Sequence, residues 1–128
     1  MCKNEFVVRR LDKGHVRADF TLKPGAFKDK RGPLSVDRSF RATIEKICKF
    51  EKKIYKFFYS KKRNGHKELY GIAKCDKELL SGSYRLCYKP NIINFRHSLL
   101  GKKEDFNACL DALDCDDLCK KFSFVSVD

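Results

Sequence analysis

The sequence has few of the residues that mark disordered, fibrous or membrane-spanning chains. Of its 128 residues only 7 are glycine and 3 are proline, while 42% are hydrophobic and 12% aromatic. That composition excludes a disordered or fibrous protein. No apolar run approaches the roughly 18–20 residues that a membrane-spanning helix needs. The first residues, 1–5, show neither the charged start nor the apolar stretch of a signal peptide. We therefore expect a soluble protein of the cytoplasm, with no membrane partner.

Paired cysteine motifs are also missing. The seven cysteines are odd in number and include no CxxC pair: Cys2, Cys48, Cys75, Cys87, Cys109, Cys115 and Cys119. In a reducing compartment such residues behave as small hydrophobic side chains, so we expect no disulfide framework. Cys115 and Cys119 are four residues apart, which places them on one face of a helix, but no standard zinc spacing is present. We predict neither a metal site nor a cofactor.

Charge is abundant and unevenly placed. The chain holds 29 Lys and Arg against 17 Asp and Glu, a net charge of +12. Residues 102–128 hold four basic and seven acidic side chains, a net −3, so the first 101 residues carry +15. The densest stretch, 41–67, has ten basic residues and two acids. The sequence thus predicts a basic body and an acidic C-terminal segment.

A concentrated basic surface attracts phosphate backbones by releasing their counterions. We therefore predict nucleic acid, RNA or DNA, as the partner, or else a protein partner in a nucleic-acid-bound complex. The predicted contacts are Arg41, Lys49, Lys53, Lys56, Lys61, Lys62, Arg63 and Lys67. Aromatic residues near 61–67, such as Tyr55 and Tyr70, add rings able to stack on bases. The alternatives are a lysine-rich surface that serves only solubility, and an acidic tail that folds back over the basic face.

The hydrophobic pattern predicts a mixed fold. Residues 5–10 and 16–22 read as strands, the second by strict alternation, and 12–15 suits a hairpin turn between them. Residues 34–37 read as extended, and Asp37 or Ser39 is a candidate N-cap for the helix that follows.

Apolar residues at steps of three and four predict the main amphipathic helix over about 39–58. Residues 54–60 also fit a strand, which leaves a hairpin through the Asn-Gly at 64–65 open as an alternative. Further along, the pattern predicts a helical turn at 78–82, a strand at 84–88, a C-terminal helix over about 104–119 and a short strand at 122–127. With no linker or repeat, the expected fold is a single small α+β domain with an antiparallel sheet.

A few residues carry the chemistry needed for catalysis. His15, Ser35, Arg38 and His97 can form a site for a phosphate-containing substrate if the fold brings them together, with arginine binding the anion and histidine moving protons. The same residues also suit capping and loop hydrogen bonds. No P-loop, GxGxxG, HExxH or helix-turn-helix motif is present. A small enzyme is thus the second functional hypothesis. A non-catalytic accessory subunit, docking through its acidic C-terminal helix, is the third.

A set of short motifs spans residues 9–101. They are Arg9-Arg10, Ala26-Phe27, Leu34-Ser35-Val36-Asp37-Arg38, Gly71 and the stretch from Pro90 through Asn94 to His97. This pattern resembles a group of small bacterial proteins of unassigned function that look like companions of toxin–antitoxin or phage-defence genes. Here the proline between the late Asn and His of that pattern is missing. The resemblance implies no established activity, but it favours Ser35, Asp37, Arg38 and His97 as site residues.

Overall fold

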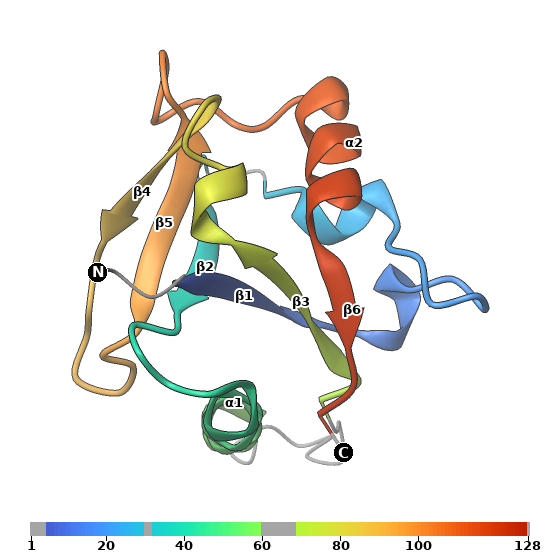
Figure 1. Cartoon of the computed structure of the whole chain (residues 1–128), viewed down its shortest axis with the longest axis vertical. Helices are drawn as coiled ribbons and strands as arrows, with labels where there is room; N and C mark the ends of the chain where they lie inside the picture. Colours follow the sequence, from blue (N-terminus) through green and yellow to red (C-terminus); the bar gives the residue numbers. More distant parts are fainter. Residues whose placement is uncertain (1–4, 30–31, 60–68, 128) are drawn as a thin grey trace.

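The computed structural model describes residues 5–29, 32–59 and 69–127, and its centre is a six-stranded sheet (Figure 1). The strands, in chain order, are β1 (Phe6–Leu11), β2 (Leu34–Arg38), β3 (Gly71–Asp76), β4 (Tyr84–Tyr88), β5 (His97–Lys102) and β6 (Ser123–Val125). Their order across the sheet is β4-β5-β2-β1-β3-β6, and every neighbouring pair is antiparallel. The predicted α+β fold is confirmed.

Two helices cover opposite faces of this sheet (Figure 1). Alternate residues of β1 belong to different cores: Phe6 and Val8 pack with Ile47 of α1 (Ile44–Tyr59), whereas Val7 packs with Leu118 of α2 (Ala112–Lys121). The second core also takes in the short 3-10 helix η2 (Pro24–Phe27), whose Ala26 and Phe27 are fully buried. Because side chains alternate between the two faces of a strand, β1 contributes buried residues to the cores on both sides of the sheet.

The main helix is shorter at its start than the predicted 39–58. Asp37 lies in β2 and is buried, and the Ser39 hydroxyl accepts a hydrogen bond from the Phe6 amide at 3.0 Å, so neither residue caps the helix. The side chain of Thr43 instead accepts from the Lys46 amide at 3.3 Å, and α1 begins at Ile44. At the other end the helix continues to Tyr59, so residues 54–59 are helical, while residue 60 and the Asn-Gly at 64–65 lie outside the described residues.

The C-terminal helix also differs from the predicted range of 104–119. Asp111 is its N-cap, and the Asp111 carboxylate accepts from the Asp114 amide at 2.8 Å. The preceding residues, 104–110, form no helix, and Phe106 among them packs over Gly101, where a β-carbon would collide with the Phe106 backbone and ring. The carboxylates expected near 104 therefore do not begin a helix.

The alternating segment 16–22 is not a strand of the sheet, so the predicted hairpin with residues 5–10 is wrong. β1 pairs with β2 and β3 instead. Val16 and Leu22 form a single antiparallel bridge and bury their side chains, while a tight turn between them exposes Phe20 at a φ of 66°. Only the two ends of the alternating pattern face the core.

The acidic C-terminal helix does not cover the basic one. α2 packs on the sheet face opposite α1, and its carboxylates serve local contacts. Asp114 lies 3.4 Å from Lys102, and Asp117 accepts from the Tyr84 hydroxyl at 2.8 Å and pairs with Lys121 at 2.9 Å. Within the described ranges, no helix combines the length and apolar character required to cross a membrane.

Candidate functional site

A polar cavity of about 420 Å³ lies between the sheet and one flank of α1. Its walls come from β1, β2, α1 and the short 3-10 helix η1 (Lys13–His15). The charged and polar side chains among its lining residues are Arg9, Arg10, Asp12, His15, Ser35, Asp37, Glu51 and Tyr55. α1 covers β1 and β3 but leaves this part of β2 open, which creates the hollow.

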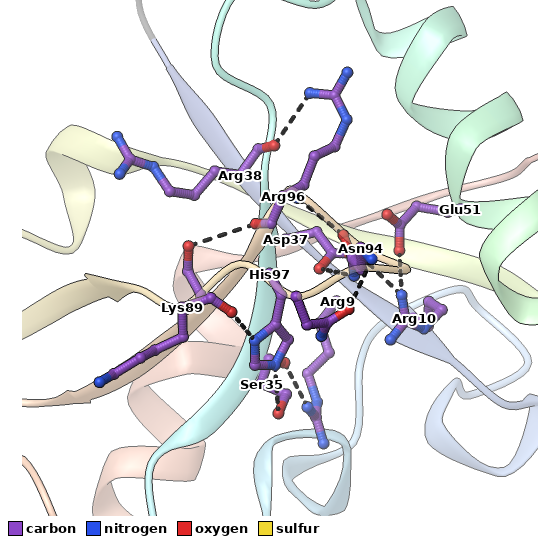
Figure 2. A network of polar contacts seen from close by, with 12 residues as sticks. Arg9, Arg10, Ser35, Asp37, Arg38, Glu51, Lys89, Asn94, Arg96 and His97 are labelled. Carbon is purple, nitrogen blue, oxygen red and sulfur yellow. Dashed lines mark hydrogen bonds and ion pairs between the residues drawn. The ribbon is translucent and has the colours of Figure 1, made fainter. Parts of the chain in front are cut away.

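Two of the four predicted catalytic residues are in contact. Ser35 Oγ lies 3.3 Å from Nε2 of His97, and Nδ1 of His97 lies 2.8 Å from the backbone oxygen of Lys89 (Figure 2). Because a carbonyl oxygen can only accept a hydrogen bond, Nδ1 of His97 must carry the proton and donate a hydrogen bond to the Lys89 oxygen. In the neutral ring Nε2 is then an acceptor and faces the Ser35 hydroxyl. A base oriented by a third group and aimed at a hydroxyl is the arrangement that activates nucleophiles.

The other two predicted residues are placed differently. His15 lines the same cavity, and its Nδ1 accepts from the Asp12 amide at 3.1 Å. Arg38 does not reach the cavity, because residues 35 and 38 project from opposite faces of β2. Its guanidinium makes two hydrogen bonds to the Glu5 carboxylate, at 2.7 and 3.0 Å. Of the four predicted residues, His15 and Ser35 thus line the cavity, His97 contacts Ser35 without lining it, and Arg38 lies elsewhere.

A buried charge network forms the cavity floor. The sequence favoured one of its members, Asp37, as a site residue, but Arg10, Glu51 and Asn94 were not predicted. Nη1 of Arg10 donates to Asp37 Oδ2 and to Glu51 Oε1, each at 2.9 Å, and the Asn94 side-chain amide donates to Asp37 Oδ1 at 2.8 Å (Figure 2). The Asp37 and Glu51 side chains are 3% and 0% exposed. One guanidinium thus faces two buried carboxyl groups.

The surroundings of Glu51 favour the protonated form of its carboxyl group. Burial and the neighbouring Asp37 carboxyl raise the pKa of Glu51 well above its usual value, and Arg10 offsets this only in part. Glu51 Oε2 is buried and has no hydrogen-bond partner among the described residues. The signal in the sequence was its position: Glu51 lies in the apolar stripe of the helix, between Ile47 and Ile54.

A second candidate site is the outer face of α1. Lys46, Lys49, Lys53 and Lys56, named here the lysine row, lie at steps of three and four, so they share one face of the helix, and all four are exposed. None of the four forms an ion pair with a described acid. Arg41, before the helix, is also exposed. This face therefore presents unneutralised positive charge.

The remaining residues predicted to bind nucleic acid are the basic residues of 61–67 and the aromatic residues near them. Lys61, Lys62, Arg63 and Lys67 lie outside the described residues. Of the rings expected beside them, Tyr55 is 5% exposed and donates to Asp12 at 3.2 Å, and Tyr70 is half-buried with its ring 5.7 Å from that of Phe124. Tyr55 thus belongs to the packed interior and is removed as a stacking platform, whereas Phe58, a further ring near 61–67, is 43% exposed.

The structure shows no group of three or more His, Cys, Asp or Glu side chains placed to hold a metal ion within residues 5–29, 32–59 and 69–127. The six cysteines in these ranges are not joined by disulfide bonds. Comparison with known proteins found no matching family model, curated protein or solved structure.

Proposed function

We propose that the protein binds nucleic acid through its phosphate backbone, and that the lysine row of α1 makes the principal contacts. The observation that carries this proposal is the row itself: Lys46, Lys49, Lys53 and Lys56 face solvent together without acidic partners. The spacing follows one helix face over about three turns, which suits a run of phosphates. The acids of α2 lie across the sheet and leave the row uncovered.

Two features of the fold support a binding role for this face. The sheet-facing side of α1 is anchored by buried Ile47 and Ile54, so the lysines extend from a rigid support. Glu51, one of the two acids of the helix, is fully buried, and only Glu45 opposes the lysines at the surface. The net charge on the exposed surface of α1 is therefore more positive than the net charge of the whole helix.

The direct test is titration of a labelled oligonucleotide, followed by fluorescence anisotropy, at several salt concentrations. Neutralising Z phosphates makes log K fall with log salt at a slope of about −0.7Z for single strands and about −0.9Z for duplex DNA. We expect the affinity to fall by at least tenfold between about 50 and about 200 mM salt. Affinity that does not change with salt, or no binding at low salt, would contradict the proposal.

A second candidate function is hydrolysis or transfer at a phosphate-containing substrate in the polar cavity. The Ser35–His97 contact favours it, since His97 Nε2 is oriented to accept the proton of the Ser35 hydroxyl. Arg9 and Arg10 also line the cavity, where the Arg9 guanidinium donates to the backbone oxygens of Ala26 and Ser35 and that of Arg10 is shared by Asp37 and Glu51. Cleavage of a labelled RNA or a phosphate ester should then be lost in both Ser35→Ala and His97→Gln variants that keep the native Tm. Cleavage that survives both substitutions rules out this chemistry.

A further inference from the structure

A cluster of aromatic and arginine side chains lies beside α1, on the side of the helix away from β6. We call it the ring cluster; its members are Arg38, Phe40, Phe50, Tyr88, Phe95 and Arg96. The Phe95 ring meets the Phe50 ring edge-on at 5.5 Å and lies nearly parallel to Phe40, with centroids 6.5 Å apart. The Arg96 guanidinium lies over both Phe50 and Phe95, at 4.9 and 4.6 Å. Rings and cations thus alternate across one surface.

The outer part of this cluster is open to solvent. Phe95 is 52% exposed and Tyr88 43%, and the neighbouring loop residue Ile93 is 43% exposed. A contiguous apolar surface of this kind marks an interaction site more often than scattered exposed residues do. Exposed rings of this kind suit a partner with flat apolar faces. The negative charge of such a partner would meet the neighbouring lysines of α1, because Arg38 is already paired with Glu5.

The loop that presents Phe95 is firmly held. The Asn91 side chain accepts from the amides of Ile93 and Asn94, at 3.0 and 2.7 Å. Asn94 is 2% exposed and donates to Asp37 at 2.8 Å, which ties the loop to the floor of the polar cavity (Figure 2). These contacts order the loop and hold Phe95 in its exposed position. A ligand that binds Phe95 therefore does not lose free energy to ordering the loop.

Phe40 adds a second sign of a built surface. Its φ of 53° lies in the left-handed region, which a bulky residue adopts only when its surroundings hold it there. The Phe40 amide donates to the Glu5 carboxylate at 3.1 Å, and the same carboxylate holds Arg38 over the Phe40 ring at a distance of 4.9 Å. These contacts fix the ring in its place in the cluster.

The ring cluster and the lysine row form one continuous surface. Phe50 belongs to α1, where Lys46 and Lys53 lie four residues before and three residues after it, so both are its neighbours on the helix surface. Phe50 in turn contacts Phe95. A strand whose phosphates follow the lysines can therefore turn its bases toward the exposed rings.

We propose that the ring cluster takes unstacked bases and that the partner of the lysine row is single-stranded nucleic acid. This inference rests on the proposed function and deepens it. Bases in a duplex are paired and stacked, so their faces cannot reach Phe95, whereas a single strand offers every base face. Stacking of this kind tolerates any sequence, so we expect little sequence preference.

The test compares a single-stranded oligonucleotide with its duplex, using anisotropy titrations of four proteins. Phe95→Leu keeps an apolar side chain but removes the ring, and Phe95→Tyr keeps the ring. Leu113→Ala is the matched control, since Leu113 is 78% exposed on α2, across the sheet. The fourth protein is the native chain, and thermal denaturation confirms that all four are folded.

We expect Phe95→Leu to weaken single-strand binding about tenfold and to leave duplex binding within about twofold, while Phe95→Tyr and Leu113→Ala behave as the native protein. If Phe95→Leu binds single strands as tightly as the native chain does, or weakens both forms equally, the inference is wrong. In that case salt-sensitive binding of the native chain still supports the lysine row. If the native chain binds neither form, the proposed function fails as well.

Discussion

Nη1 of Arg10 lies 2.9 Å from Oε1 of Glu51, although the two residues are 41 positions apart and belong to β1 and α1. The contact joins the sheet to the helix that carries the lysine row. It also leaves Arg10 shared with Asp37, so that one guanidinium makes an ion pair with each of two buried carboxyl groups. The stability of the helix–sheet layer should therefore respond to pH through Glu51.

Glu51→Gln tests this response. Because the pKa of Glu51 is raised in the folded protein, the native state binds its proton more tightly than the unfolded chain does. The stability of the native protein should then fall as pH rises above about 4.5, the value near which an unfolded glutamate titrates. Glutamine mimics the protonated form and removes this loss.

The measurement is urea denaturation of both proteins at about pH 5 and about pH 8. We expect the free energy of unfolding of Glu51→Gln, relative to that of the native protein, to rise between the two pH values. An equal destabilisation at both pH values would show that the ionised carboxylate, paired with Arg10, is the stable form.

Arg10→Met removes the shared cation. The variant leaves Asp37 and Glu51 buried without a positive partner, and breaking a buried pair in this way costs about 3–5 kcal/mol. Arg41→Met is the control, because Arg41 is exposed and its loss should change stability by less than about 0.5 kcal/mol. Chemical denaturation at neutral pH gives both values. A loss below about 1 kcal/mol for Arg10→Met would mean that the carboxyl groups need no counter-charge.

The two described histidines should adopt opposite neutral tautomers. Nδ1 of His97 donates to the Lys89 carbonyl, whereas Nδ1 of His15 accepts from the Asp12 amide. Nitrogen-15 NMR of the imidazoles at alkaline pH distinguishes the two forms: we expect the proton on Nδ1 in His97 and on Nε2 in His15. Ser35→Ala should leave the His97 tautomer unchanged, because Lys89 sets it. A His97 ring protonated on Nε2 would remove the proposed base.

The hydrophobic pattern of the sequence correctly predicted those helices and strands in which the apolar residues are the buried ones. Ile44, Ile47 and Ile54 recur at helical spacing, and the helix follows them. Alternation at 16–22 misled because only Val16 and Leu22 face the core, around a turn held by the Asp19 side chain, which accepts from Thr21. A short alternating sequence pattern does not show whether its central residues are buried in the folded protein.

The site was predictable in its residues but not in its contacts. Ser35 and His97 were identified singly, yet they are 62 positions apart and meet only because β2 pairs with β5, a register that periodicity does not specify. β5 itself lies in a stretch whose mixed apolar pattern predicted no strand. Phe95 was missed since an exposed ring and a buried one look alike in sequence.

The most direct test of the central claim compares two variants of equal net charge. One replaces the lysine row, Lys46, Lys49, Lys53 and Lys56, by glutamine. The other replaces four exposed lysines away from α1, namely Lys23, Lys28, Lys103 and Lys120. The measured quantity is the slope of log K against log salt for a single-stranded oligonucleotide.

Each lost phosphate contact should reduce the slope by about 0.7, so we expect the row variant to lose about 3 and the control variant to stay within about 1 of the native value. That result would place the phosphate contacts on α1. Equal slopes for the two variants would show that binding follows total charge, and would contradict the account.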